Sequence, residues 1–195
     1  RLEPPVLIPR PESGELVEHV VELARTAISC KGGTLRILDV GTGSGAIGLA
    51  IAHSVPRASV VGIDVSDKAV RLASANAARL QLDARFEALH VPRGVAAYAP
   101  ACRFDVVVSN PPYIPAAAMG ALQPEVGAHE DHRALCGGAD GADVVREVLL
   151  AVPRLLHPRG PRAVWMEVDC THPPLLAAWL AGAGPPAPHP PPAGV

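Results

Sequence analysis

Apolar residues follow two spacings that alternate along the chain. Between Glu12 and Ile28 they recur every three or four residues, which is typical of a helix with one buried face. Elsewhere they form short continuous runs bounded by turn residues, which indicates buried strands. The predicted strands are Leu35–Val40, Ala58–Ile63, Arg85–His90, Phe104–Ser109 and Ala163–Val168. The predicted helices are Glu12–Ile28, Ala46–His53, a segment capped by Ser66 that runs to about Leu80, a segment that ends at Leu156, and Pro174–Leu180.

Strands that alternate with helices predict an α/β fold. We expect a doubly wound, mostly parallel sheet with helices on both faces. Right-handed crossovers and a switch point after the first strand favour the strand order 3-2-1-4-5. Residues 1–11 are expected to form an extended segment and residues 12–183 the α/β domain. Residues 184–195 consist mainly of Pro, Gly and Ala and are expected to be disordered.

Composition narrows the class of partner. The formal net charge is −2, so no overall basic field favours binding to nucleic acid. No apolar run approaches the roughly 18 residues of a membrane span, and we predict no membrane partner. The four cysteines show no Cys-x-x-Cys spacing, so they indicate neither a zinc site nor a disulfide framework. We therefore expect four reduced thiols in an intracellular protein.

A glycine-rich turn follows the first predicted strand. It contains Asp39, Gly41, Thr42, Gly43, Ser44 and Gly45. Glycines let a ligand lie against the backbone, and Asp64, at the end of the second strand, is placed to accept both hydroxyls of a ribose. Asp39 would repel a pyrophosphate but suits the ammonium of a methionine moiety, which argues against a dinucleotide. The alternative is a tight turn that holds no ligand.

A second motif, Asn110-Pro111-Pro112-Tyr113, follows the fourth predicted strand and faces the same crevice. Asn110 Oδ1 and the Pro111 carbonyl can both accept hydrogen bonds from one NH2 group and so orient its nitrogen for attack. Neither proline has an N–H that would compete, and Tyr113 offers a flat wall for a planar group. These residues predict methyl transfer to an amide or amine nitrogen. The alternative is an ordinary Pro-rich turn.

In combination, these motifs resemble the HemK family, the glutamine-N5 methyltransferases that act on the Gly-Gly-Gln motif of peptide chain release factors. The matching segments are Ile8–Glu12, Leu38–Leu49, Ser109–Ile114, Glu130–Asp131, Ala134–Leu135 and Gly137–Gly141. Pro153–Leu156 and Glu167–Asp169 look most like the animal, mitochondrial branch. Two departures stand out: the acidic residue expected after the third strand is missing from Leu89–Pro92, and we expect no counterpart of the family's helical domain or of its last two strands within residues 1–195.

The resemblance implies a Rossmann-like class I methyltransferase that uses S-adenosyl-L-methionine. The glycine turn, Asp64 and Asn110 would hold this cofactor, and Asn110–Tyr113 would hold the glutamine. A release factor would be the partner. The location would be mitochondrial, although the chain shows no targeting segment, with a cytoplasmic location as the alternative.

Two other functions stay open at this point. An adenine-N6 methyltransferase acting on DNA or RNA uses the same Asn-Pro-Pro-Tyr geometry, but the 3% aromatic content and the acidic balance of this chain count against it. A catalytically inactive methyltransferase-like binding module is the other alternative. His129-Glu130-Asp131-His132 could suggest a metal site, but adjacent loop residues rarely converge on one ion, so we predict none.

Overall fold

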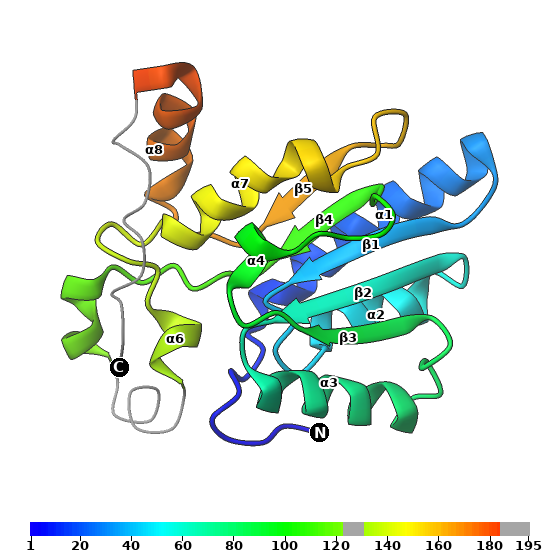
Figure 1. Cartoon of the computed structure of the whole chain (residues 1–195), viewed down its shortest axis with the longest axis horizontal. Helices are drawn as coiled ribbons and strands as arrows, with labels where there is room; N and C mark the ends of the chain where they lie inside the picture. Colours follow the sequence, from blue (N-terminus) through cyan, green and yellow to red (C-terminus); the bar gives the residue numbers. More distant parts are fainter. Residues whose placement is uncertain (123–130, 184–195) are drawn as a thin grey trace.

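The computed structural model describes residues 1–122 and 131–183, which form one sheet with helices around it (Figure 1). The strands are β1 (Leu35–Val40), β2 (Ala58–Asp64), β3 (Phe86–His90), β4 (Val106–Ser109) and β5 (Ala163–Met166). The helices are α1 (Glu12–Lys31), α2 (Ala46–Ser54), α3 (Asp67–Arg79), α4 (Gly94–Ala97), α6 (His132–Leu135), α7 (Asp143–Leu155) and α8 (His172–Ala178). Two further short helical segments are η1 (Ala116–Ala121) and η2 (Trp179–Ala183).

The five strands are all parallel and lie in the order β3-β2-β1-β4-β5. This arrangement confirms both the predicted fold class and the predicted strand order. At the carboxyl end of β1, Val40 is paired with Ile63 of β2 and with Ser109 of β4. The segments that follow these three strands therefore begin at one edge of the sheet, where the arrowheads in Figure 1 point towards α6.

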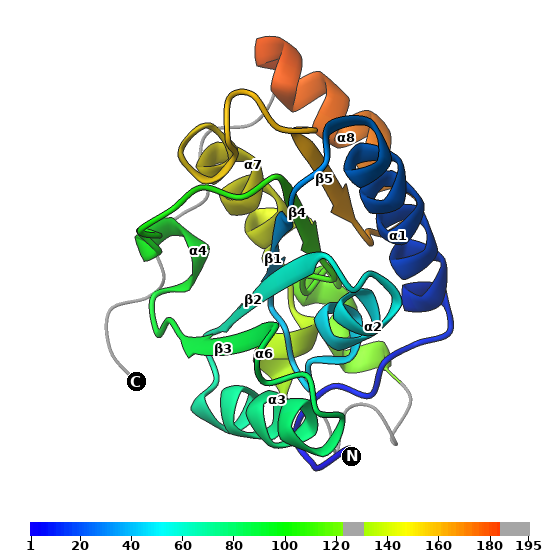
Figure 2. The same cartoon turned by 90° about the vertical axis from the view of Figure 1, so that its right-hand side faces the viewer.

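Helices cover both faces of the sheet, with α1 and α2 on one face and α4 and α7 on the other (Figure 2). Strand β4 shows how one short apolar run serves both layers. Val106 and Val108 belong to the core beneath α1 and α2, whereas Val107 belongs to the core beneath α4 and α7. All three side chains are fully buried, as expected for a central parallel strand covered on both sides.

The structure differs from the predicted elements mainly in the connections. The predicted loop between Asn110 and about Ala139 contains η1 and α6, and its residues 123–130 lie outside the described part. The first 11 residues contain no helix or strand, but they turn where Val6 N–H donates to the Glu3 carbonyl. The predicted tail, 184–195, also lies outside the described residues. Within the described part, no helix is long and apolar enough to cross a membrane.

Candidate active site

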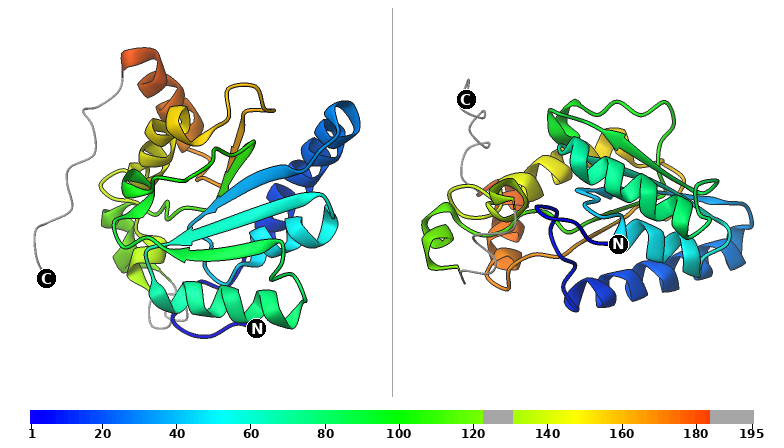
Figure 3. Two further views of the ribbon diagram at one scale, coloured as in Figure 1. Left: turned by 45° about the vertical axis from the view of Figure 1, so that its right-hand side comes forward. Right: turned by 90° about the horizontal axis from the view of Figure 1, so that it is seen from below.

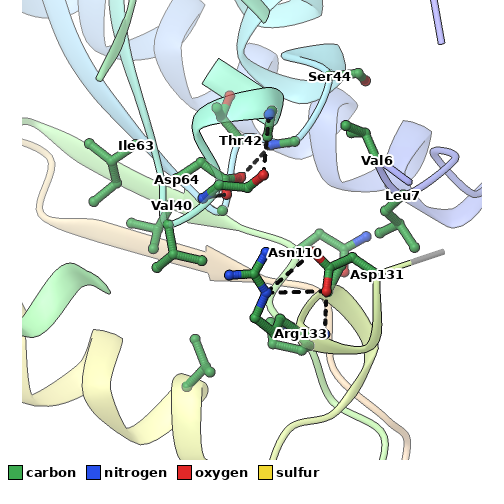
Figure 4. A pocket seen from close by; sticks show the side chains of 18 of the residues that line it. Val6, Leu7, Val40, Thr42, Ser44, Ile63, Asp64, Asn110, Asp131 and Arg133 are labelled. Atoms are coloured by element: carbon green, nitrogen blue, oxygen red, sulfur yellow. Dashed lines mark hydrogen bonds and ion pairs between the residues drawn. The ribbon is translucent and has the colours of Figure 1, made fainter. Parts of the chain in front are cut away.

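A cavity of about 200 Å³ opens at the carboxyl ends of β1, β2 and β4. Of the residues predicted to bind ligands, Gly41, Thr42, Gly43, Ser44, Asp64, Asn110 and Pro112 line it. Asp39, Gly45, Pro111 and Tyr113 do not. Figure 4 shows Thr42 and Asp64 on one side of the cavity and Asn110, Asp131 and Arg133 on the other. The fold therefore brings the two sequence motifs together around one space.

The glycine turn has the backbone conformation that its composition predicts. Gly41, Gly43 and Gly45 all have positive φ angles, in the region that side chains disfavour. Gly45 also has no room for a side chain, because a Cβ there would come within 2.9 Å of Leu49 Cδ1. Gly41 and Gly43, which line the cavity, thus present backbone to it rather than side chains.

Asp39 lies beneath this turn rather than in the cavity wall. Its Oδ2 accepts hydrogen bonds from Thr42 Oγ1 at 2.7 Å and from Gly48 N at 3.1 Å, while Oδ1 has no hydrogen-bond partner among the described residues. Burial raises the pKa of the Asp39 carboxyl to about 6, against the lowering effect of those two bonds; Asp64 adds a smaller increase. In this arrangement Asp39 braces Thr42 and α2, and its predicted contact with an ammonium group stays a prediction.

Asp39 should make folding stability depend on pH. An aspartate in an unfolded chain has a pKa of about 3.9, so between pH 4 and pH 6 the folded state binds more protons than the unfolded state. Stability from this group is therefore fully present below pH 4 and is lost as the pH rises through 6.

Relative to Asp39→Asn, wild type should lose on the order of 3 kcal/mol of unfolding free energy between pH 4 and pH 7. Denaturant titrations at several pH values measure this; Asp83→Asn, at an exposed position, controls for the loss of one charge. Identical pH slopes for wild type and Asp39→Asn would contradict the expectation.

Asp64 lies at the end of β2, as predicted, and its two oxygens hold the local backbone. Oδ2 accepts from Gly43 N at 2.9 Å, and Oδ1 accepts from Ser66 N at 2.8 Å. Burial raises the pKa of this carboxyl above its usual value, against these two bonds. Each carboxylate oxygen keeps a second lone pair, so both can still accept from hydroxyl groups of a ligand in the cavity.

Asn110 belongs to a chain of hydrogen bonds that runs to β5. Tyr113 Oη and Ser13 Oγ both donate to the Glu167 carboxylate, at 3.4 Å and 2.8 Å, and Asn110 Nδ2 lies 3.1 Å from Ser13 Oγ. An ionised carboxylate can only accept, so the Ser13 hydroxyl must donate to it and use a lone pair to accept from Asn110. The group that faces Ser13 is therefore the NH2 of the Asn110 side chain. The other end of this carboxamide, Asn110 Oδ1, accepts no hydrogen bond from the described residues and is left for another donor.

A second segment supports the Asn-Pro-Pro-Tyr loop from behind. Ile114 N donates to the Leu135 carbonyl, and Gly137 N donates to the Ile114 carbonyl, both at 2.9 Å. A Cβ on Gly137 would lie 2.6 Å from the Pro112 carbonyl oxygen, and one on Gly141 would lie 2.3 Å from that of Tyr113. Glycine at both positions therefore lets the two backbones pack directly together and fixes the course of the loop.

The N-terminal segment and the residues around α6 close one side of the cavity. Val6 and Leu7 line it together with Asp131 and Arg133, whose side chains form an ion pair at 2.8 Å. Asp131 N also donates to the Pro5 carbonyl at 3.0 Å. In the left view of Figure 3, the dark blue N-terminal segment runs beside the carboxyl ends of the strands.

The sequence did not point to Ser13, Arg133 or Glu167 as site residues. One signal was available for Glu167, because it directly follows β5 and ligands of parallel sheets bind at the carboxyl ends of strands. Of the segment suspected of binding metal, His129 and Glu130 lie outside the described residues. Within the described part, no group of three potential ligands comes together.

Comparison with known proteins shows the family of this chain. The sequence model of the methyltransferase small domain matches residues 14–123, more than half of the chain, including the glycine turn, Asp64 and Asn110. The chain belongs to this family. The resemblance to glutamine methyltransferases is confirmed by relatives from animals and bacteria.

These relatives have release factors in their names, as two examples show. The MTRF1L release factor glutamine methyltransferase of Homo sapiens is 40% identical to this chain. The aligned region covers 92% of this chain and 54% of the human protein. The release factor glutamine methyltransferase of Gloeobacter violaceus is 44% identical over 93% of this chain and 60% of its own length. The chain thus spans little more than half the length of these relatives.

A solved structure shows the same fold. The catalytic domain of hMettl16, in complex with MAT2A 3'UTR hairpin 6, superposes on this chain with a TM-score of 0.65. The match covers 93% of this chain and 66% of the hMettl16 chain. Sequence identity is 16%, so the likeness concerns the fold alone.

Proposed function

We propose that this chain transfers a methyl group from S-adenosyl-L-methionine to the side-chain nitrogen of glutamine in the Gly-Gly-Gln motif of a peptide chain release factor. The observation that carries the proposal is the fixed carboxamide of Asn110. Its NH2 is held by Ser13, and its Oδ1 is left to accept beside a cavity that Asp64 and the glycine turn share. The names of the relatives supply the substrate class.

The residues of the cavity suit the cofactor. Gly41 and Gly43 have no side chains and so leave room for a ligand against the backbone, and Asp64 retains two acceptor positions for the ribose hydroxyls. Apolar side chains such as Ile63 and Val95 supply a surface for an aromatic base. Bound there, the cofactor would supply a methyl group made electrophilic by its positively charged sulfur.

Asn110 and Pro111 would act on the nucleophile. An amide nitrogen attacks poorly because its lone pair is delocalised into the carbonyl group. Hydrogen bonds from its two N–H groups to Asn110 Oδ1 and to the Pro111 carbonyl favour the pyramidal form, in which the lone pair is available. The nitrogen would gain a bond to the methyl carbon as the bond from that carbon to sulfur breaks, and it would lose one proton to solvent. Both acceptors stabilise the positive charge that the nitrogen develops.

Tritiated methyl transfer tests this proposal. The chain should label the Gly-Gly-Gln domain of a release factor and should not label the same domain after its glutamine is changed to glutamate. A DNA duplex and an RNA hairpin serve as parallel substrates. Label on the nucleic acid alone would replace the proposal with adenine-N6 methylation, and cofactor binding without transfer to any substrate would favour a binding module.

A mitochondrial location stays a prediction from the family resemblance.

A further inference from the structure

The position of a bound adenine follows from the proposed function and the strand order. In the order β3-β2-β1-β4-β5, Asn110 follows β4, the glycine turn follows β1 and Asp64 ends β2. Under the proposed function, Asn110 would face the methyl group and Asp64 the ribose. The adenine ring would then lie farther along the same edge of the sheet, towards the end of β3.

The walls at that end of the cavity are apolar. Val65, Val91 and Val95 line it together with Gly94. His90, the last residue of β3, uses Nε2 in a contact of 3.1 Å with the Val65 carbonyl. The segment after β3 therefore lines this end of the cavity with apolar side chains, which suit the faces of a purine, and adds no carboxylate to the lining.

Glu147 brings a carboxylate to this slot from another element. Its helix, α7, packs against α4 over the second face of the sheet. Glu147 Oε2 lies 3.7 Å from the position of a Cβ on Gly94, whose own φ is positive, and the side chain lines the cavity. The carboxylate of Glu147 therefore lies beside the Gly94 backbone at this end of the cavity.

Glu147 differs from the other acids that line the cavity. Asp64 accepts from two backbone N–H groups, and Asp131 is paired with Arg133. Glu147 makes neither a hydrogen bond nor an ion pair with any residue in 1–122 or 131–183. Burial, and to a smaller degree the charge of Asp143, raises the pKa of its carboxyl. A half-buried carboxylate without a partner is costly, and a donor supplied by a ligand would remove that cost.

We propose that Glu147 accepts a hydrogen bond from the exocyclic amino group of the adenine ring and so selects adenine over purines that lack this group. It would supply from α7 the acidic contact that the segment after β3 lacks. The inference rests on the proposed use of S-adenosyl-L-methionine. It assigns Glu147 to the specificity of binding and gives it no part in the transfer step.

Calorimetric titration with two ligands tests the role of Glu147. One is S-adenosylhomocysteine, and the other is its analogue with hydrogen in place of the 6-amino group. Hydrogen bonds to charged groups contribute enough that wild type should prefer the adenine compound by about 10- to 100-fold. In Glu147→Ala this preference should fall to within about threefold. Glu22→Ala, on the exposed side of α1, should keep the full preference.

The outcomes separate the inference from the proposed function. If wild type binds both compounds equally, or if Glu147→Ala keeps the full preference, Glu147 does not read the amino group, although the cofactor proposal stands. If wild type binds neither compound, the proposed function fails and the inference fails with it. If Glu147→Ala does not fold, Glu147→Gln is tested instead. Its side chain offers a neutral acceptor and should retain only part of the preference for the adenine compound. An unchanged preference in Glu147→Gln would overturn the inference.

Discussion

Asn110→Ala is expected to lower the turnover number for a release-factor substrate by about 10²–10³, with a much smaller rise in the Michaelis constant. Asn110 Oδ1 should bond the substrate nitrogen more strongly as that nitrogen becomes pyramidal and gains positive charge, so the loss falls on the transition state. Removing one preorganised bond of this kind typically costs about that factor in rate. The chain of bonds through Ser13 to Glu167 fixes the carboxamide before substrate arrives, which makes the bond preorganised.

Steady-state kinetics with a Gly-Gly-Gln domain at saturating cofactor measure the effect of Asn110→Ala, with cofactor affinity determined in parallel. Ser109→Ala is the matched control. Ser109 is fully buried beside Asn110, but its hydroxyl donates to the Val40 carbonyl at 2.7 Å and does not line the cavity. This control should lose about 1 kcal/mol of stability and little turnover. Activity of Asn110→Ala within about threefold of wild type would show that the assigned role is wrong, whereas loss of cofactor binding alone would assign Asn110 to the cofactor.

Asp64→Ala should weaken binding of S-adenosylhomocysteine by about 2–3 kcal/mol, or roughly 30- to 150-fold. The variant loses the acceptors for the ribose hydroxyls and also the bond that holds Gly43 N in the glycine turn. Both losses act on the ground state, so they should appear in the dissociation constant.

Isothermal titration calorimetry measures the Asp64→Ala effect directly. Asp67→Ala is a suitable control, because Asp67 is an exposed acid three residues farther along that pairs with Arg71 and does not line the cavity. Its affinity should stay within about twofold of wild type. An Asp64→Ala variant that binds as tightly as wild type would remove Asp64 from the cofactor site.

The central elements could be predicted because each carries a local signal. β1 and β4 are short apolar runs, and α1 repeats its apolar residues at helical spacing, so pattern alone placed them. The helices α4 and α6 have four residues each, which is too short for any periodicity to show. The bounds of longer elements also shifted; α8, for example, begins at His172 rather than Pro174, within the usual fraying of helix ends.

The residues of the candidate site also fall into two groups, those with a local sequence signal and those without one. The glycine turn and Asp64 were predicted because their spacing within one strand–helix–strand unit is fixed by the fold. The contact of Ser13 with Glu167 joins residues 154 positions apart, and no local pattern encodes it. The face on which Asp39 lies depends on the register of β1. Residues 35, 37 and 39 share the side covered by α2, which turns this carboxylate towards Gly48 and away from the cavity.

The pairing of β1 with β4 has a consequence for how the protein folds. Val40 and Ser109, which meet at the ends of these strands, are 69 residues apart in the sequence. Closing so long a loop is entropically costly and slows folding, whereas β1, β2 and β3 can pair through shorter connections. The half of the cavity with the glycine turn and Asp64 can therefore form first, and Asn110 joins it only when β4 inserts beside β1. A ligand that touches both halves binds only the finished sheet, and by mass action it depletes the chains in which β4 has come away.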